Sequence, residues 1–306
     1  MDIESESFFQ KKKNLLKKIQ SKYILKLIMD NLKENIRLKL IKYNKSLQNK
    51  LDIKLKDYAE YSKIIIIEIV PSKVLQKAYF INFDPNEKDY IKIYFDGKRR
   101  KENYITKKDN VSKIKIIIKR EFKKFNNLFY HCKFIEKITF VCFNRDDIED
   151  MGNMFGECIN LKEINFNSFN TKNVANMIAM FSDCNSLTKL NLSKFNTSNV
   201  FYMNYMFDNC INLEELDISN FDTSNVINME RMFHKCSFLK TIIHPKLNAY
   251  KVTSANEMLF KCSSLKELNI NFNTNLDINN YQMLYGCSNE LKKCIKKNNK
   301  NLVFKK

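Results

Sequence analysis

The sequence predicts an α/β solenoid, in which stacked repeats each add one helix and one strand to a shared core. Three observations predict it: cysteines recur at a constant interval, methionine and phenylalanine columns keep the same period, and each repeat has helical apolar spacing followed by a Leu-rich segment. With 44% hydrophobic residues the chain can bury a core. One such unit is too small to enclose a core, so the copies must stack.

Residues 1–60 are predicted to form a basic helical N-terminal region with a net charge of +7. Apolar residues recur at helical spacing from Ile24 to Leu47, with no Gly or Pro between them. The segment from Met1 to Gln20 lacks the apolar run of a secretory signal, and the longest apolar stretch, Ile64 to Val70, is too short to span a membrane. We therefore expect a cytoplasmic protein, with the cell surface as the alternative.

Residues 61–110 are predicted to form a β-rich capping segment. Tyr79–Phe83 and Tyr90–Phe95 have the composition of strands, and Asp96-Gly97 is a strong signal for a hairpin turn. Four basic residues, Lys98 to Lys101, follow this turn. We expect the segment to cover the first repeat, because the end of a solenoid must not expose bare apolar surface.

Residues 111–295 are predicted to form the solenoid, with about seven turns, and residues 296–306 a basic C-terminal tail. Between Val174 and Cys184 the apolar residues lie on one helical stripe, and the polar cluster before them offers helix caps. Leu187, Leu190 and Leu192 then read as a strand with its apolar side facing inward. Leu291 is expected to begin the last strand.

The recurring cysteines are expected to be free, buried thiols that weakly donate their S–H groups. They are Cys132, Cys158, Cys184, Cys210, Cys236 and Cys262, followed at a slightly shorter interval by Cys287. Equivalent positions on neighbouring helices lie about 8–10 Å apart, beyond the reach of a disulfide. No C-x-x-C spacing suggests zinc. The Met and Phe columns are expected to form core.

The sequence offers no catalytic pattern. His131, His234 and His244 have no matched nucleophile or carboxylate at a recurring spacing, and four glycines leave no phosphate-binding loop. We therefore expect a non-enzymatic protein with no cofactor, no metal and no small-molecule substrate.

The string Met-x-x-Met-Phe-x-x-Cys-x-x-Leu-x-x-Leu-x-Leu, with Phe-Asn-Thr-Ser-Asn-Val at 195–200, resembles the BspA-like leucine-rich repeats. This is the 25 to 26 residue form found in bacterial lipoproteins and protist surface proteins. The resemblance covers residues 111–295, somewhat over half of the chain. It implies a leucine-rich-repeat solenoid with a parallel sheet on the concave face, and a family whose characterised adhesins bind host proteins.

Two outward columns of the predicted sheet are expected to line this concave face. The first alternates in charge, through Lys137, Glu163, Lys189, Glu215, Thr241 and Glu267, and the second runs through Asn165, Asn191, Asp217, Ile243 and Asn269. Opposite charges on strands about 4.8 Å apart would be direct neighbours. Because solenoids usually bind partners on this face, the candidate partner-binding residues are Glu163, Asn165, Lys189, Asn191, Glu215, Asp217, Glu267 and Asn269.

These observations favour a protein-interaction scaffold whose protein partner the sequence does not identify. The positive charge lies outside the solenoid body, since residues 61–134 carry +10 and residues 271–306 carry +5, whereas residues 135–270 carry −3. The basic ends suggest the alternative of a nucleic-acid or anionic-membrane binder. A further alternative is a cell-surface adhesin exported without a recognisable signal.

Overall fold

The computed structural model describes residues 45–51, 64–73, 76–119, 121–143, 145–166, 169–244, 247–273 and 277–305. The chain divides into two compact units, Met1–Ile64 and Ile65–Lys306. In the first unit the described element is helix α4 (Lys45–Leu51), and the rest of the predicted helical region lies outside the described residues. Within the described parts of the chain, no helix has the length and apolar character needed to cross a bilayer.

The second unit begins with an antiparallel sheet. The first elements of this unit are β1 (Ile65–Pro71), β2 (Ala78–Tyr79), the 3-10 helix η1 (Pro85–Tyr90), β3 (Ile91–Phe95), β4 (Lys98–Arg100), β5 (Tyr104–Ile105), β6 (Ile114–Ile118) and β7 (Ile135–Cys142). With β8 (Glu163–Asn165), five of them form a sheet in the order β4-β3-β6-β1-β7-β8, in which β1 is antiparallel to both β6 and β7, while β2 and β5 pair with each other. The predicted hairpin is confirmed, because β3 and β4 pair antiparallel around Asp96 and Gly97, which both have positive φ.

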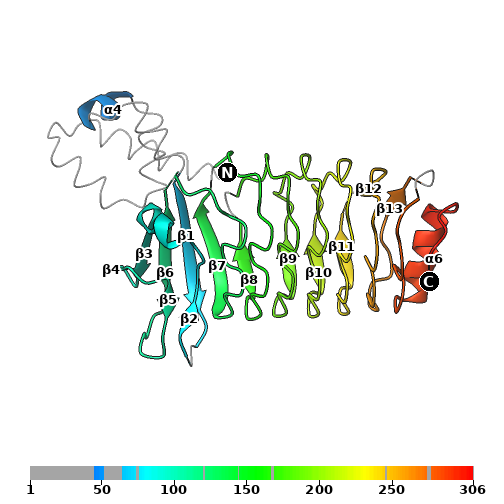
Figure 1. Ribbon diagram of the computed structural model, residues 1–306, viewed down its shortest axis with the longest axis horizontal. Coiled ribbons are helices and arrows are strands. Elements are labelled where there is room, and N and C mark those ends of the chain that lie inside the picture. The colour runs from blue at the N-terminus through cyan, green and yellow to red at the C-terminus, as the bar shows by residue number, and fades with distance from the viewer. Residues whose placement is uncertain are drawn as a thin grey trace, which may run out of the picture. The chain divides into compact units, whose positions relative to one another are not determined.

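Short parallel strands follow, and the repeat between Cys236 and Cys262 contributes two of them. They are β8 (Glu163–Asn165), β9 (Lys189–Asn191), β10 (Glu215–Asp217), β11 (Thr241–Ile243), β12 (Leu247–Ala249) and β13 (Ile270–Phe272). Parallel pairing links β7 with β8, β9 with β10, β10 with β11, and β12 with β13. In Figure 1 the turns from β8 to β13 lie side by side in sequence order. The predicted stacking of repeats is therefore confirmed as a β-solenoid.

The solenoid has about five turns, fewer than the seven predicted. The predicted solenoid was to begin at residue 111, but β6 and β7 each pair antiparallel with β1. At the other end, Leu291 lies in a helix and not in a strand. The first parallel contact between repeats is the one between β7 and β8.

The predicted helix in each repeat is wrong. The segment from Val174 to Cys184 consists of consecutive turns, in which Ala179 and Asp183 have φ of 50° and 58°. Left-handed residues interrupt an α-helix. The same pair of positive-φ positions recurs in each repeat: Asn127 and His131, Asn153 and Glu157, Tyr205 and Asn209, Arg231 and Lys235, Glu257 and Lys261, and Gln282 and Gly286.

Alternate backbone amides of this turn segment bond to the next repeat, and the amides between them bond within the segment. The N–H groups of Met177, Ala179, Phe181 and Asp183 donate to carbonyls at the equivalent level of the following repeat, over 2.8–3.1 Å. Parallel bridges also join Asp150, Asn176, Tyr202, Asn228, Ser254 and Asn279 in one continuous column. Each repeat is thus hydrogen-bonded to its neighbour through two segments, the strand and the turn segment.

The polar motif at 195–200 forms a corner rather than the predicted helix cap. The hydroxyl of buried Thr197 donates to the carbonyl of Asp222 at 2.9 Å and accepts from the amide of Asp222 at 2.8 Å. The side-chain amide of Asn199 donates to the carbonyl of Lys172 at 2.9 Å. Since Asp222 lies in the following repeat and Lys172 in the preceding one, the motif joins three consecutive turns.

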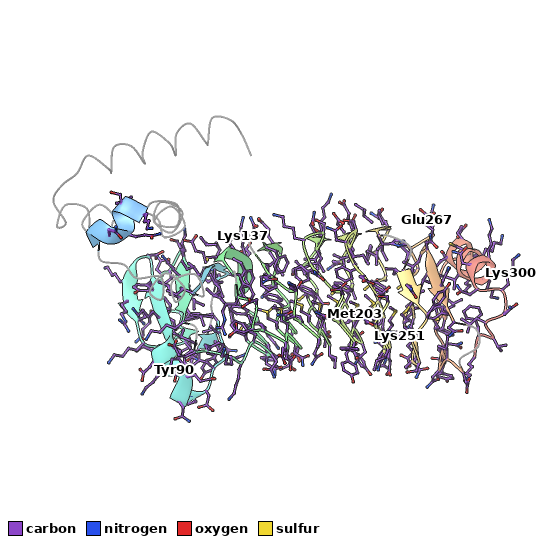
Figure 2. All side chains as sticks on the ribbon, turned by 90° about the horizontal axis from the view of Figure 1, so that it is seen from above. Tyr90, Lys137, Met203, Lys251, Glu267 and Lys300 are labelled. Atoms are coloured by element: carbon purple, nitrogen blue, oxygen red, sulfur yellow. The ribbon has the colours of Figure 1, made fainter. Side chains whose placement is uncertain are left out.

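The Met and Phe columns form the core, as predicted, and Met203 in Figure 2 belongs to them. The rings of Phe129, Phe155, Phe181, Phe207 and Phe233 stack in one column with centroids 5.4–5.7 Å apart. Helix α6 (Asn289–Asn298) contains buried Leu291 and Ile295 at the C-terminal end, so Leu291 does not begin a strand as expected. The side chain of Asn299 accepts a hydrogen bond from the amide of Phe272 at 2.8 Å and closes β13.

Two alanine-to-glycine substitutions test the left-handed turns. We expect Ala179→Gly to raise the free energy of unfolding by up to about 1 kcal/mol, because the left-handed backbone strains alanine but not glycine. Ala175→Gly, at an earlier position of the same segment without positive φ, should lower it by about 0.5–1 kcal/mol. Urea denaturation of the two variants beside the parent measures both. If both variants lose stability to the same extent, residue 179 is not left-handed in solution.

Candidate functional site

The sheet face is formed by Lys137, Glu163, Asn165, Lys189, Asn191, Glu215 and Asp217 on strands β7 to β10, whereas Glu267 and Asn269 lie outside the strands. The amine of Lys137 lies 2.7 Å from the carboxylate of Glu163, and that of Lys189 lies 2.8 Å from Glu215. The predicted charge alternation is therefore confirmed at these two pairs. The hydrogen bond with Glu215 raises the pKa of the Lys189 amine. Both pairs are solvent-exposed, so they contribute little to stability.

The structure brings four of the predicted site residues directly together. Lys189 is opposite Glu215, and Asn191 is opposite Asp217, on neighbouring strands β9 and β10. Glu163 and Asn165 lie on β8, which pairs with β7, and Glu267 and Asn269 precede β13. Figure 2 shows Lys137 and Glu267 along the same long side of the stack. Partner binding by these residues stays a prediction.

The polar column has a structural role that its spacing in the sequence did not indicate. The side-chain oxygen of Asn191 accepts hydrogen bonds from the backbone amide of Ser193 at 3.0 Å and from its hydroxyl at 2.6 Å. In the next repeat, Asp217 accepts one from the amide of Ser219 at 3.0 Å. These bonds close the turn that follows each strand. Because its side-chain oxygens are bonded within the turns, the polar column is less available for contact with a partner than the charged column.

A groove beside the sheet face was missed by sequence reasoning. A second charge-alternating column runs next to the first, and its exposed pairs are Lys162 with Glu136 at 2.6 Å and Lys240 with Glu214 at 2.7 Å. Thr188 interrupts this column, and a shallow depression of about 450 Å³ lies there. It is lined by Lys162, Ser186, Thr188, Asn212, Glu214 and Phe238. The hydrogen bond with Lys240 lowers the pKa of Glu214.

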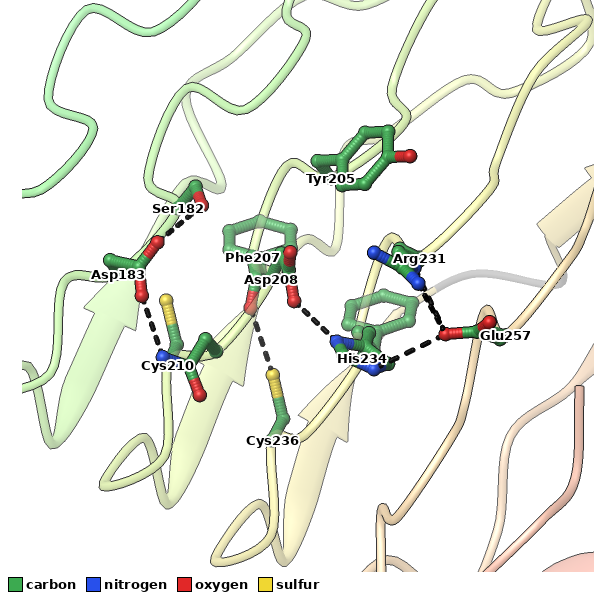
Figure 3. A network of polar contacts seen from close by, with 12 residues as sticks. Ser182, Asp183, Tyr205, Phe207, Asp208, Cys210, Arg231, His234, Cys236 and Glu257 are labelled. Atoms are coloured by element: carbon green, nitrogen blue, oxygen red, sulfur yellow. Dashed lines mark hydrogen bonds and ion pairs between the residues drawn. The ribbon is translucent and has the colours of Figure 1, made fainter.

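The turn segments carry a polar network centred on His234, which is buried (Figure 3). Its Nδ1 lies 2.6 Å from Asp208, and its Nε2 lies 3.4 Å from Glu257, which also pairs with Arg231 at 2.9 Å. No matched carboxylate was expected for this histidine from the sequence, although Asp208 lies one repeat earlier in the chain. Because carboxylates occupy both ring nitrogens, the network ties three turns together.

His131 repeats this arrangement on a smaller scale, with its Nδ1 2.6 Å from Glu157 in the following turn. The hydroxyl of Tyr130 donates to the same carboxylate at 2.5 Å, and these hydrogen bonds lower the pKa of Glu157. His244 instead accepts a hydrogen bond from the backbone amide of Asn269 at 3.4 Å. The three histidines therefore all link neighbouring repeats.

The recurring cysteines donate their thiols to backbone carbonyls of the preceding repeat, which fits the predicted weak S–H donor. In Cys158, Cys184, Cys210, Cys236 and Cys262 the sulfur lies 2.9–3.1 Å from the acceptor oxygen. Burial raises the pKa of Cys158 to about 12 and that of Cys287 to about 11. Among the residues that the structure describes, no group of three or more His, Cys, Asp or Glu could hold a metal ion.

The basic cluster after the hairpin turn divides into two parts. Arg100 is half-buried, 3.2 Å from Asp109 and over the ring of Phe95 at 5.0 Å. Lys98, Arg99 and Lys101 are exposed. Arg100 is therefore engaged within the cap, whereas the other three cations extend into the solvent around β4.

Thiol accessibility gives a direct check on the cysteine column. At pH 8 we expect a thiol reagent to label about one cysteine per native chain, because burial and raised pKa keep the column thiols protonated and shielded. Half-buried Cys294 is the expected reactive residue, and in denaturant all nine should react. Ellman's reagent measures the count, and Cys294→Ser should abolish the native reaction. Rapid native labelling of Cys158 would contradict the packed thiol column.

Comparison with known proteins gives one family. The family described as "Mycoplasma protein of unknown function, DUF285" matches residues 123–240 and 187–300. These overlapping matches together cover more than half of the chain, and they include the parallel turns and the whole of helix α6. No curated protein and no solved structure matches the chain significantly. The chain belongs to the DUF285 family.

Proposed function

We propose that the chain is a non-enzymatic protein-interaction scaffold of the BspA-like leucine-rich-repeat type, which binds a protein partner across its sheet face. The observation that carries the proposal is the row of exposed, alternating charges on consecutive strands. Lys137 and Glu163 on β7 and β8, and Lys189 and Glu215 on β9 and β10, present the two signs at fixed spacing. The solenoid fold supports this role, because stacked repeats form extended surfaces for partners.

The same charges are poorly explained as a source of stability. Exposed ion pairs contribute little to folding, because water screens them and ordering long side chains costs entropy. Since these ion pairs contribute little to folding, their charges can also pair with the charges of a partner at little cost in stability. Across an interface, a complementary charge pattern sets the register, rejects wrong partners and speeds association.

A second candidate function is the binding of an anionic polymer or membrane through the cap. The exposed cations Lys98, Arg99 and Lys101 favour it. Cations on a short edge strand also keep that edge from pairing with other chains, which is a sufficient structural reason for them. For this reason the sheet face is the preferred binding surface.

Swapping one ion pair tests the sheet face without removing the pair. The double variant Lys189→Glu with Glu215→Lys keeps the internal attraction but inverts the pattern that a partner meets. We expect partner capture by the full-length chain to weaken about tenfold or more. The matched control is Lys305→Asp with Asp277→Lys, which swaps an exposed pair near the C-terminus, 3.0 Å apart, and should leave capture unchanged.

Quantitative mass spectrometry of proteins retained from an extract of the source cells measures the effect. Equal capture by the swapped and parent chains would refute binding across the sheet face. If capture instead disappears in the Lys98→Ala, Arg99→Ala, Lys101→Ala variant and falls steeply with salt, the anionic-ligand function is the correct one.

A further inference from the structure

We infer that the groove at Thr188 is a docking site for an extended peptide segment of the partner, carrying an acidic, a basic and an apolar side chain in that order along the stack. This inference rests on the proposed function and specifies the segment that would be recognised. It involves residues outside the sheet face, so the two ideas can fail separately.

The groove exists because two neighbouring columns become short in the same repeat. One column runs through Glu136, Lys162, Thr188, Glu214 and Lys240, and the other through Phe134, Asn160, Ser186, Asn212 and Phe238. Thr188 and Ser186 are the smallest residues of their columns and lie two positions apart in one turn. The hydroxyl of Ser186 donates to the carbonyl of Ile159 at 2.7 Å, which fixes the floor of the groove.

The walls of the groove have opposite charges. Lys162 lies on the side of the preceding repeat and Glu214 on the side of the following one, and both line the depression. Each has its ion-pair partner on the far side, Glu136 for Lys162 and Lys240 for Glu214. These pairs are exposed, so each wall residue can accept a second partner of opposite charge at low cost.

The spacing of the walls suits an extended chain. Lys162 and Glu214 belong to repeats two steps apart, about 10 Å at the spacing of hydrogen-bonded strands. An extended peptide advances about 3.3 Å per residue, so its acidic and basic side chains should be roughly two to four positions apart. The charge order fixes which side chain of the segment meets which wall, in either direction of the peptide chain.

Phe238 supplies the apolar contact. Its side chain is 52% exposed and lines the groove beyond Glu214. The equivalent positions in the preceding repeats are Phe134, Asn160, Ser186 and Asn212. Phe134 is partly buried against the core, whereas Phe238 has half of its side chain in water. Aromatic side chains that become buried on association commonly anchor protein interfaces. Phe238 therefore marks the end of the groove where the apolar residue of the peptide binds.

Selection from a phage-displayed library of random dodecapeptides tests the inference on the full-length chain. We expect enriched peptides to share an acidic, a basic and an apolar residue in this order or its reverse. The best peptide, synthesised with a fluorescent label, should bind Phe238→Ser and Thr188→Arg at least about tenfold more weakly in anisotropy titrations, since these variants remove the anchor or fill the groove. The matched control Phe201→Ser removes another aromatic side chain, 43% exposed, and should bind like the parent.

Repeating the selection on Glu214→Lys should replace the basic residue of the peptides by an acidic one. The inference would be overturned if the selected peptides shared no charge pattern. It would also be overturned if the best peptide bound the parent, Phe238→Ser and Thr188→Arg equally well. If partner capture is lost in the Lys189–Glu215 swap but unchanged in both groove variants, the scaffold function stands and the groove is not its docking site.

Discussion

The structure depends on one constraint, that neighbouring repeats keep the same length, which holds from Cys132 to Cys262 and changes by one residue before Cys287. Amides in the turn segment, such as that of Phe181, and strand residues such as Leu190 both pair with the following repeat. An insertion between these two segments would shift one hydrogen-bonded ladder against the other. It would leave buried backbone groups unpaired, each at a cost of about 1–3 kcal/mol. This requirement explains the constant interval between the cysteines in the sequence.

Stacking in register also explains why whole columns repeat the same residue. A residue in one turn has its counterpart in the next turn as its nearest neighbour, so a side chain that packs well against itself suits every copy. The phenylalanine rings stack nearly parallel, with interplanar angles of 2–10°. Thr171 and Thr197 likewise each bridge to the following turn through one hydroxyl. Each column is therefore a continuous interaction along the molecule.

The period, the core columns and the charge ladder could be predicted from the sequence because all three depend only on spacing. The segment from Val174 to Cys184 was misassigned because apolar spacings of three and four positions fit a helix and a series of tight turns equally well. The distinction lies in backbone φ at Ala179 and Asp183. Asn and Asp tolerate the left-handed region and recur at Asn153, Asp183 and Asn209, which is a weak signal, but alanine and arginine at equivalent positions hide it.

The groove was not found because it arises from residues that break their columns, and a search for periodicity discards these. Residues that differ from repeat to repeat are of two kinds. His234 is buried and carboxylates of both neighbouring repeats meet its ring nitrogens, so the fold itself accounts for it. Phe238 stands in a mostly polar column and leaves half of its side chain in water. Stacking gains little from an exposed aromatic side chain at such a position. Phe238 is therefore the residue of the groove that the fold explains least, which is why the proposed docking of a peptide is centred on it.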